Sequence, residues 1–464
     1  MIRFILNNEL IKTDLPSGSL LLDFVRYRKA LTGTKIGCRE GDCGACTMLI
    51  GTPNDSGIDY LQVTSCLTPL GNVHGKHAVT IEGLNMDELS PVQQHMINES
   101  GTQCGFCTVG FVVSLSGFCM ANKAATYQEA IAAIDGNICR CTGYKSIERA
   151  ALNLTKDLAQ KSLSDPLNWL IENKFIPNYF SSIPKRLNDI GASKTEETGR
   201  YIGGGTDLYV QQHLALVDHN AVHISNLAHL KFIRSDKNTI HIGGATTVTE
   251  FLESTEIQGL FPNLWAHVKL VSSSPIRNIS TFAGNFVNAS PIGDFTAFFI
   301  ALDASITLKK DTNERIIKLK SFYKGYKYLD LQEGELISSI SFEAPAPTSQ
   351  FNLEKVSKRI HLDIATVNTA VLISVAEDKI SEIHVSAGGV GPIPIYLEKT
   401  RAFLLGKEIS SETIKSANEV MQGEVSPISD VRGTQEYKRL LLRQLFYAHF
   451  VKLFPSKITL KDLV

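Results

Sequence analysis

The sequence has no long hydrophobic run and no recognisable targeting segment. Its longest apolar stretch, around residues 105–120, is interrupted by Gly, Ser, Thr and Cys and is too short to span a bilayer. The chain begins Met1-Ile2-Arg3-Phe4, which is unlike a signal peptide. We therefore expect no membrane association and, because the cysteines described below fit reduced metal ligands, a cytoplasmic location.

An excess of charge of either sign is also missing. The 464 residues carry 46 basic and 47 acidic side chains, for a net charge of −1. This balance gives no electrostatic reason for a nucleic-acid partner. Hydrophobic content of 43% and charged content of 20% are those of an ordinary globular protein, and the length predicts two to four domains.

Cysteine is absent outside residues 38–141, where all nine cysteines lie. The first set is Cys38, Cys43, Cys46 and, after a gap, Cys66. The spacing C-x4-C-x2-C with a distant fourth cysteine is the plant-type pattern for a [2Fe–2S] cluster. Gly37, Gly41 and Gly44 allow a loop to wind tightly enough to direct several thiolates to one centre.

A second set of four comprises Cys104, Cys107, Cys139 and Cys141. Two short cysteine pairs separated by a helical stretch supply four thiolates for either a small iron–sulfur cluster or a zinc ion, and C-x-C is an unusual zinc half-site. A disulfide scaffold is disfavoured in so long a chain without a signal peptide. The remaining Cys119 lies in an apolar run and is expected to be a buried structural thiol.

The local patterns predict several elements. Alternation over residues 2–6, the pair Asn7-Asn8 and a return strand indicate a hairpin. Ser17 or Ser19 is expected to cap a helix running to Gly33, and strands are expected near 46–50 and 60–65. Capping signals then favour four helices, near 91–99, 108–121, 127–136 and 146–160, whereas 161–185 shows no sustained period and is interpreted as an extended linker.

Two later stretches carry candidate phosphate-binding loops. Tyr201-Ile202-Gly203-Gly204-Gly205-Thr206-Asp207-Leu208 contains three consecutive glycines, which allow a close approach of backbone N–H groups to an anion. It is not the G-x-G-x-x-G fingerprint. Three glycines without a second signal would more safely be interpreted as a tight turn. The second stretch, Pro275-Ile-Arg-Asn-Ile-Ser-Thr-Phe-Ala-Gly-Asn-Phe-Val-Asn-Ala-Ser-Pro-Ile-Gly-Asp294, favours a binding role for both.

These segments together resemble one family. The motifs at residues 37–47 (Gly-Cys-Arg-Glu-Gly-Asp-Cys-Gly-Ala-Cys-Thr), 103–110 (Gln-Cys-Gly-Phe-Cys-Thr-Val-Gly) and 137–144 (Asn-Ile-Cys-Arg-Cys-Thr-Gly-Tyr) are similar to the iron–sulfur modules of the molybdenum hydroxylases, the xanthine oxidase family. The two glycine-containing stretches resemble the pyrophosphate loops of the same family's FAD domain. The resemblance covers nearly the whole chain.

The resemblance implies an α+β multidomain fold. We expect a ferredoxin-like β-grasp [2Fe–2S] domain (1–83), a four-helix [2Fe–2S] bundle (84–160), the linker (161–185), a non-Rossmann α+β FAD-binding domain of the vanillyl-alcohol-oxidase (PCMH) type (186–345) and an α+β flavin C-terminal domain (348–460). The strand over 336–342 and the basic strand Lys355-Val-Ser-Lys-Arg359 would lie in the last two domains.

The family also implies roles for individual residues. The eight cysteines of the two sets would hold two [2Fe–2S] clusters. Residues Tyr201 to Leu208 would wrap the FAD diphosphate, Asp294 would bind a ribose hydroxyl, and Lys355 would reach the flavin side. Gly205 stands where eukaryotic relatives have Asn. Further FAD contacts are expected from Thr281, Gly284, Asn285, Asn288 and Leu336.

By the same resemblance, the chain is an electron-transfer subunit without a substrate-transforming residue of its own. A large partner subunit would hold the molybdenum cofactor and hydroxylate a purine, and electrons would pass through the helical cluster, the ferredoxin-like cluster and FAD to NAD. A heterodimer, or a dimer of heterodimers, is expected. Three alternatives stay open: an aldehyde or N-heterocycle hydroxylase subunit, a stand-alone electron carrier, and a zinc-stapled binding module.

Overall fold

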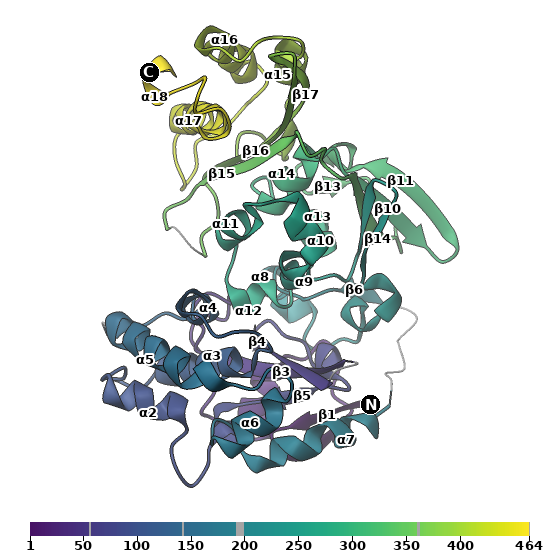
Figure 1. Ribbon diagram of the computed structural model, residues 1–464. Coiled ribbons are helices and arrows are strands. Elements are labelled where there is room, and N and C mark those ends of the chain that lie inside the picture. Colours follow the sequence, from purple (N-terminus) through teal and green to yellow (C-terminus); the bar gives the residue numbers. More distant parts are fainter. Residues whose placement is uncertain (55–56, 142, 192–198, 360–361, 464) are drawn as a thin grey trace. The chain divides into compact units, whose positions relative to one another are not determined.

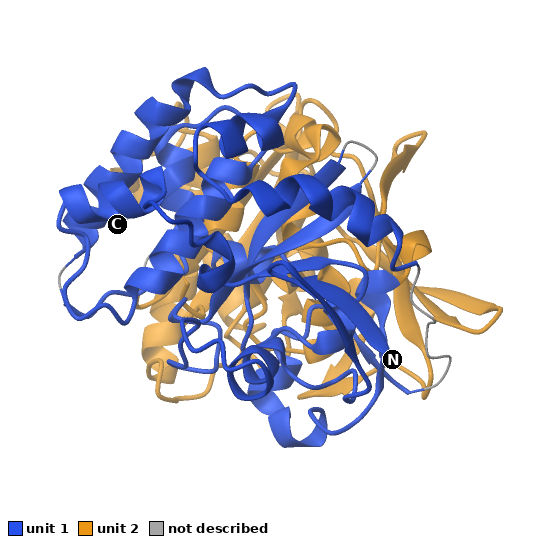
Figure 2. Ribbon diagram, turned by 90° about the horizontal axis from the view of Figure 1, so that it is seen from below, with its two compact units in different colours: residues 1–226, 273–280 blue, residues 227–272, 281–464 orange. Residues whose placement is uncertain are grey.

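The computed structural model describes residues 1–54, 57–141, 143–191, 199–359 and 362–463. Two compact units divide the chain, as the colours of Figure 2 show. Unit 1 contains Met1–Asn226 and Ser273–Ser280, and unit 2 contains Leu227–Ser272 and Thr281–Val464. The short segment 273–280 therefore belongs, in space, with the cysteine-bearing part of the chain.

A mixed five-stranded sheet opens unit 1. Its strand order is β2-β1-β5-β3-β4, with bounds Ile2–Leu6 (β1), Glu9–Thr13 (β2), Thr47–Asn54 (β3), Gly57–Thr64 (β4) and His77–Val79 (β5). The predicted hairpin is confirmed, because β1 pairs antiparallel with β2 and Asn7 takes the left-handed φ of 52° that the turn requires. Phe4, Met48 and Val63 are buried in the core of this sheet.

Four helices follow, as the capping signals predict. They are α2 (Pro91–Asn98), α3 (Thr108–Met120), α4 (Tyr127–Ala133) and α5 (Tyr144–Asp157), the last continued by one 3-10 turn (Figure 1). At the start of α2, Ser90 and Gln93 form a reciprocal capping box. Helix α3 is buried along almost its whole length and packs on β3 and β4, so the helical part and the sheet share apolar contacts.

The prediction of an extended linker over 161–185 is wrong. This segment contains α6 (Pro166–Glu172), a 3-10 turn (Asn178–Ser182) and the start of α7 (Ile183–Asn188). Leu170, Phe175 and Phe180 are buried in the same apolar cluster as the four helices. Each helix here is only two turns long or less, so no sustained helical period is visible in the sequence.

The predicted helix from residue 19 to Gly33 is also corrected. The structure has only α1 (Leu21–Asp23) followed by a π-helical turn (Phe24–Arg28), and no side chain caps α1. The serines expected to cap it bond elsewhere in unit 1: the Ser19 hydroxyl donates to the Val217 carbonyl at 2.9 Å, and Ser17 accepts from the Ala221 N–H at 3.0 Å. Tertiary hydrogen bonds replace the local cap.

The rest of unit 1 contains the first candidate phosphate loop. Strand β6 (Arg200–Ile202) leads into it and pairs in parallel with β7 (Ala221–His223), and α8 (Leu208–Gln211) follows it. The short helix α12 (Ser274–Arg277) also belongs to this unit.

Unit 2 has an antiparallel sheet in the order β11-β10-β14-β9-β8 with helices packed beside it. The strands are β8 (Ile233–Asp236), β9 (Thr239–Gly243), β10 (Ser305–Lys310), β11 (Asn313–Lys318) and β14 (Leu336–Glu343), and the small pair β12 (Tyr323–Gly325) and β13 (Tyr328–Leu329) forms a separate ribbon. The helices are α9 (Val248–Glu253), α10 (Thr255–Leu260), α11 (Leu264–Lys269), α13 (Phe282–Asn288) and α14 (Asp294–Ala301).

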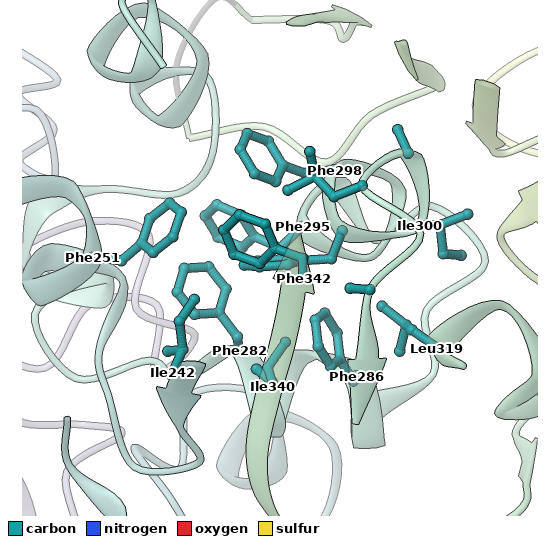
Figure 3. Packing of buried hydrophobic residues seen from close by; sticks show 14 of the residues in the cluster. Ile242, Phe251, Phe282, Phe286, Phe295, Phe298, Ile300, Leu319, Ile340 and Phe342 are labelled. Atoms are coloured by element: carbon teal, nitrogen blue, oxygen red, sulfur yellow. The ribbon is translucent and has the colours of Figure 1, made fainter. Parts of the chain in front are cut away.

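Phenylalanines fill the core between this sheet and its helices. Figure 3 shows Phe251, Phe282 and Phe295 gathered above the strands, and the rings of Phe282 and Phe295 meet edge to face at 4.9 Å. Such aromatic pairs add to the roughly 1.5–3 kcal/mol that burying each apolar side chain contributes. The core fixes α13 and α14, which carry the second candidate phosphate stretch.

A second sheet and a layer of helices complete unit 2. The sheet order is β15-β16-β17-β18, with bounds Gln350–Val356, Val367–Ala376, Lys379–Gly388 and Ile395–Tyr396. The helices are α15 (Glu398–Leu404), α16 (Ser411–Gln422), α17 (Gln435–Leu453) and α18 (Leu460–Leu463). Throughout the described ranges, no helix combines the length and the apolar character needed to cross a membrane.

Candidate functional site

The first cysteine set converges in unit 1, on the loop before β3 and the turn after β4. Cys46 and Cys66 are buried, and Cys38 and Cys43 are partly exposed. Backbone N–H groups point at the sulfurs: that of Glu40 lies 3.3 Å from Cys38 Sγ, and that of Cys38 lies 3.4 Å from Cys43 Sγ. The loop reaches this geometry through left-handed φ values of 79° at Gly41 and 68° at Gly44.

The four thiols of this set lie in two hydrogen-bonded pairs. The hydrogen bond from Cys43, aided by backbone N–H groups, lowers the pKa of Cys38 to about 5, and the same bond raises the pKa of Cys43. The pair Cys46 and Cys66 behaves likewise, with the pKa of Cys46 lowered by the bond from Cys66 and that of Cys66 raised. Two thiol pairs with inward-pointing N–H groups fit a two-iron cluster that needs four thiolates.

The second set converges in the helical part. The backbone N–H of Phe106 and the thiol of Cys141 lower the pKa of Cys104, and the bond with Cys104 raises that of Cys141. Burial, followed by its bond to Cys139, raises the pKa of Cys107 to about 12. The four thiols therefore pair as Cys104 with Cys141 and Cys107 with Cys139.

Each of these two pairs joins a cysteine from the start of α3 to a cysteine that precedes α5. Cys107 is the N-cap residue of α3, and the N–H of Gly143, the N-cap of α5, lies 3.4 Å from Cys139 Sγ. Cys104 is exposed, whereas Cys139 is buried. Among the described residues, no three His, Cys, Asp or Glu side chains are grouped as a site for one metal ion. Thr142 of this motif lies outside the described residues.

The two cysteine-bearing loops are hydrogen-bonded to each other. The N–H of Ile138, beside Cys139, donates to the carbonyl of Cys43 at 3.0 Å. The Asn137 amide donates to the carbonyl of Gly44 at 3.2 Å, and its oxygen accepts from Ser114 at 2.8 Å. Cys43 of the first set is thus connected to Cys139 of the second through this hydrogen bond and one peptide bond.

Cys119 is placed as the sequence predicts. Its side chain is 1% exposed inside α3. Burial, not a neighbouring cysteine, raises its pKa to about 12, so it stays a thiol at neutral pH.

The glycine loop 203–205 packs on the ferredoxin-like part of unit 1. The Asn72 amide donates to the Gly203 carbonyl at 2.9 Å, and the Asn72 oxygen in turn bonds His223 Nδ1 at 2.7 Å. Gly205 has a φ of 82°, and a Cβ there would lie 3.0 Å from the carbonyl of Leu67, next to Cys66. Glycine adopts this left-handed conformation without strain.

Gly204 has a structural requirement that the sequence did not indicate. A Cβ on Gly204 would lie 1.8 Å from the carbonyl oxygen of Ile279, so the glycine is required by the chain's own backbone. The other loop residues are Tyr201, Thr206, Asp207 and Leu208, all partly exposed, and the buried Ile202. Asn72 and the backbone of Ile279 both contact this loop.

The second candidate stretch is mostly in unit 2. Thr281 is the N-cap of α13 and accepts from the N–H of Gly284 at 3.1 Å. Asn285 accepts from Thr296 at 3.4 Å, and Asn288 accepts from Lys327 at 3.1 Å. These polar side chains therefore also have structural roles. Leu336 begins β14 opposite Lys309.

Asp294 and Lys355 form a buried ion pair in unit 2. The Lys355 Nζ atom lies 2.8 Å from Asp294 Oδ2, with the two side chains 2% and 8% exposed. Lys355 also donates to the carbonyl of Leu270 at 2.7 Å, and Asn368 donates to Asp294 Oδ1 at 2.6 Å. The sequence predicted both charged residues as separate FAD contacts, but not that they bind each other.

Several residues of these sites were missed from the sequence. Asn72 and Asn368 each stand in a segment without a motif, so no sequence signal could have found them. Arg277 lies within the predicted stretch 275–294, where an arginine directly after Pro275 and Ile276 was a usable signal. Asp135 pairs with it at 2.6 Å.

Comparison with known proteins identifies the domains in this order. Family models match for a 2Fe-2S iron–sulfur cluster binding domain (residues 4–70), a [2Fe-2S] binding domain (80–152), an FAD binding domain in molybdopterin dehydrogenase (178–345) and a CO dehydrogenase flavoprotein C-terminal domain (353–453). Both cysteine sets and both candidate phosphate stretches fall within the matched regions.

Curated relatives span nearly the whole chain. Xanthine dehydrogenase from Emericella nidulans is 27% identical over 88% of this chain and 35% of its own length. Xanthine dehydrogenase 1 from Arabidopsis thaliana is 25% identical over 95% of this chain and 39% of its own length. The chain thus spans less than half the length of the relatives it matches.

Solved structures share part of the fold. A carbon monoxide dehydrogenase from Hydrogenophaga pseudoflava, which lacks the Mo-pyranopterin moiety of the molybdenum cofactor, matches 55% of this chain and 88% of its own with a TM-score of 0.51 and 25% identity. Quinoline 2-oxidoreductase from Pseudomonas putida 86 gives the same TM-score and coverage at 22% identity. This second likeness shows a shared fold and nothing more.

These findings define a class: an α+β multidomain oxidoreductase chain with [2Fe–2S] and FAD-binding domains. The cofactors named by these matched domain families are [2Fe-2S] clusters and FAD.

Proposed function

We propose that this chain is the small subunit of a bacterial xanthine dehydrogenase. A large partner subunit with the molybdenum cofactor would oxidise hypoxanthine and xanthine to urate in purine catabolism, and this chain would pass the electrons to NAD. The complex would be a cytoplasmic heterodimer or a dimer of heterodimers. Several xanthine dehydrogenases that match nearly the whole chain support this choice.

The observation that carries the proposal is the arrangement of ligands in unit 1. Cys104, in the second set, is exposed and so is accessible to a partner chain. The second set contacts the first through the Ile138–Cys43 hydrogen bond, and the residue after Cys66 lies against the glycine loop at Gly205. This supports the order helical cluster, ferredoxin-like cluster, FAD.

Each part of that order would rest on named residues. The eight thiolates of the two sets would hold two [2Fe–2S] clusters. Residues 201–208, with Thr281, Gly284, Asn285, Asn288, Asp294, Leu336 and Lys355, would hold FAD. Bound [2Fe–2S] centres carry single electrons, and a flavin exchanges them for the electron pair that NAD accepts. The chain's own task is to hold these groups in sequence.

A subunit of an aldehyde or N-heterocycle hydroxylase is the second candidate. The match to the carbon monoxide dehydrogenase flavoprotein C-terminal domain favours keeping it, because this part of the fold is shared by hydroxylases of other substrates. Substrate choice would lie in the partner chain, so identifying the chain that co-purifies decides between the two.

The test separates the tasks of the two chains. The isolated chain should oxidise NADH with an artificial dye but should not oxidise xanthine at any concentration. Adding the partner should restore NAD-linked turnover of xanthine. Cys104→Ser should then block electron delivery to NAD while xanthine still reduces the molybdenum centre, and Cys119→Ser should behave as wild type.

Two results would refute the proposal. One is xanthine turnover by the chain alone. The other is a normal rate of NAD reduction in the Cys104→Ser complex. A native preparation without molybdenum or a second chain would instead support a stand-alone electron carrier.

A further inference from the structure

The short helix α12 (Ser274–Arg277) contacts the loops of both cysteine sets within unit 1. By sequence it belongs to the region matched by the FAD-binding family, residues 178–345. A Cβ on Gly136 would lie 2.9 Å from Pro275 Cδ, and a Cβ on Gly41 would lie 2.7 Å from Ile276 Cδ1. Position 136 precedes Cys139 closely, and Gly41 lies between Cys38 and Cys43, so one helical turn touches both loops.

A buried ion pair fixes this contact. Arg277 donates to Asp135 Oδ2 at 2.6 Å, and the two side chains are 2% and 7% exposed. The other carboxylate oxygen, Asp135 Oδ1, accepts from the N–H of Ser274 at 2.7 Å. The Ser274 hydroxyl accepts from Arg277 at 2.9 Å and donates to the Ala132 carbonyl at 2.8 Å. Both carboxylate oxygens are therefore satisfied.

Asp135 begins the segment that presents Cys139. The segment 135–139 connects the end of α4 to Cys139. At its other end, Ile138 and Asn137 are hydrogen-bonded to Cys43 and Gly44 of the first loop. Arg277 thus anchors the start of a segment whose end holds a cysteine of one set against the loop of the other.

We propose that Asp135 and Arg277 are positioning residues for the helical [2Fe–2S] cluster: the FAD-binding region, through α12, holds the segment that presents Cys139. The inference rests on the proposed function in one respect, namely that the second set binds a cluster. A buried charge left without its partner is strongly destabilising, whereas replacing both partners by neutral groups is often tolerated. The pair therefore lends itself to a double-mutant test.

The test uses the full chain with its clusters. Arg277→Met should alter the line shape of the reduced helical cluster in low-temperature EPR or remove most of its signal, while the ferredoxin-like signal is kept. It should also weaken any magnetic interaction between the two reduced clusters. Hydrogen exchange at the amides of residues 134–141 should become faster in the same variant.

Two further variants keep the test decisive if Arg277→Met folds poorly. Asp135→Asn combined with Arg277→Met removes both charges and should bring the helical signal and the exchange rate back toward wild type. Arg277→Lys retains the charge but loses the planar fork, and should fall between wild type and Arg277→Met. The matched control is Arg315→Met in unit 2, which breaks pairs of 2.8 Å to Asp330 and 2.7 Å to Glu335; it should leave both EPR signals unchanged.

The inference is overturned if Arg277→Met shows a wild-type helical signal and wild-type exchange at 134–141. It is also overturned if the double variant is as impaired as the single one, because packing and not the ion pair would then be responsible. A wild-type chain without iron at the second set would refute the proposed function instead.

Discussion

The buried carboxylate of Asp294 is hydrogen-bonded by residues that are distant in the sequence. Asp294 is bonded by Lys355 and Asn368, which stand 61 and 74 residues away. Besides the FAD contacts expected of them, Asp294 and Lys355 therefore compensate each other's charge in the core of unit 2. A ribose hydroxyl would use the lone pairs of Asp294 that these two donors leave.

Lys355→Met should destabilise unit 2 by about 3–5 kcal/mol, because it leaves the Asp294 carboxylate buried and without its cation. Denaturant unfolding followed by circular dichroism measures this loss. FAD content should fall in the same variant. Adding Asp294→Asn should recover most of the stability but not the FAD. Equal stability of the single variant and wild type would show that the pair contributes little.

At the scale of elements, local signals in the sequence predicted what short-range physics decides. The capping box of Ser90 and Gln93 and the turn at Asn7 were recognisable because their hydrogen bonds join residues within a few positions. The four helices and the strand from Leu336 followed from the same kind of pattern. The short cysteine motifs were recognisable for the same reason, because the spacing within each motif is local.

Long-range packing was not predictable. Residues 161–185 form short helices because Leu170 and Phe180 are buried against other helices, which no period in the sequence reveals. Ser17 and Ser19 bond the segment 217–221 and so do not cap a helix. The close contact of Gly204 was also not predictable, since the backbone of Ile279 lies 75 positions further along the chain.

Asn72→Ala should loosen the glycine loop. The Asn72 amide holds the Gly203 carbonyl, and losing a buried hydrogen bond costs about 1–3 kcal/mol. We therefore expect a lower FAD content per chain, measured by flavin absorbance after gel filtration, with the iron content unchanged. Asn226→Ala is the matched control, because Asn226 bonds the neighbouring Gly71 carbonyl. Full flavin content in Asn72→Ala would place the diphosphate elsewhere.

Buried neutral histidines connect elements in both units and predict acid sensitivity. Burial lowers the pKa of His77 from its usual 6.5 to about 4 and that of His449 to about 3. His77 bonds Tyr60 at 2.7 Å and the Asn7 carbonyl at 2.8 Å, and His449 bonds Asn352 at 2.8 Å. Below pH 6.5 the unfolded chain therefore binds more protons than the folded chain, and acid favours unfolding.

Between pH 7.5 and 5.5, each of these histidines should lower the free energy of unfolding by about 1 kcal/mol. Denaturant unfolding of wild type and His449→Gln at both pH values measures the effect. The variant should be less stable at pH 7.5 but show a smaller loss on acidification, and the exposed His229→Gln should retain the wild-type loss. An unchanged pH dependence in His449→Gln would contradict this account.

At the scale of the molecule, the two cysteine sets and the glycine loop are neighbours within unit 1. Two cysteine sets lie on hydrogen-bonded loops, and the first of them adjoins the glycine loop. Along the chain, the family matches run from the ferredoxin-like domain through the helical [2Fe-2S] domain to the FAD-binding domain. The matched xanthine dehydrogenases are more than twice as long as this chain.

The most direct test of the central claim is the metal content and EPR of the purified full chain. We predict about four irons and four acid-labile sulfides per chain, with two distinguishable signals on reduction. Cys139→Ser should remove only the helical-domain signal, Cys43→Ser only the ferredoxin-like one, and Cys119→Ser neither. Zinc at the second set, half of that iron, or loss of a signal in Cys119→Ser would contradict the account.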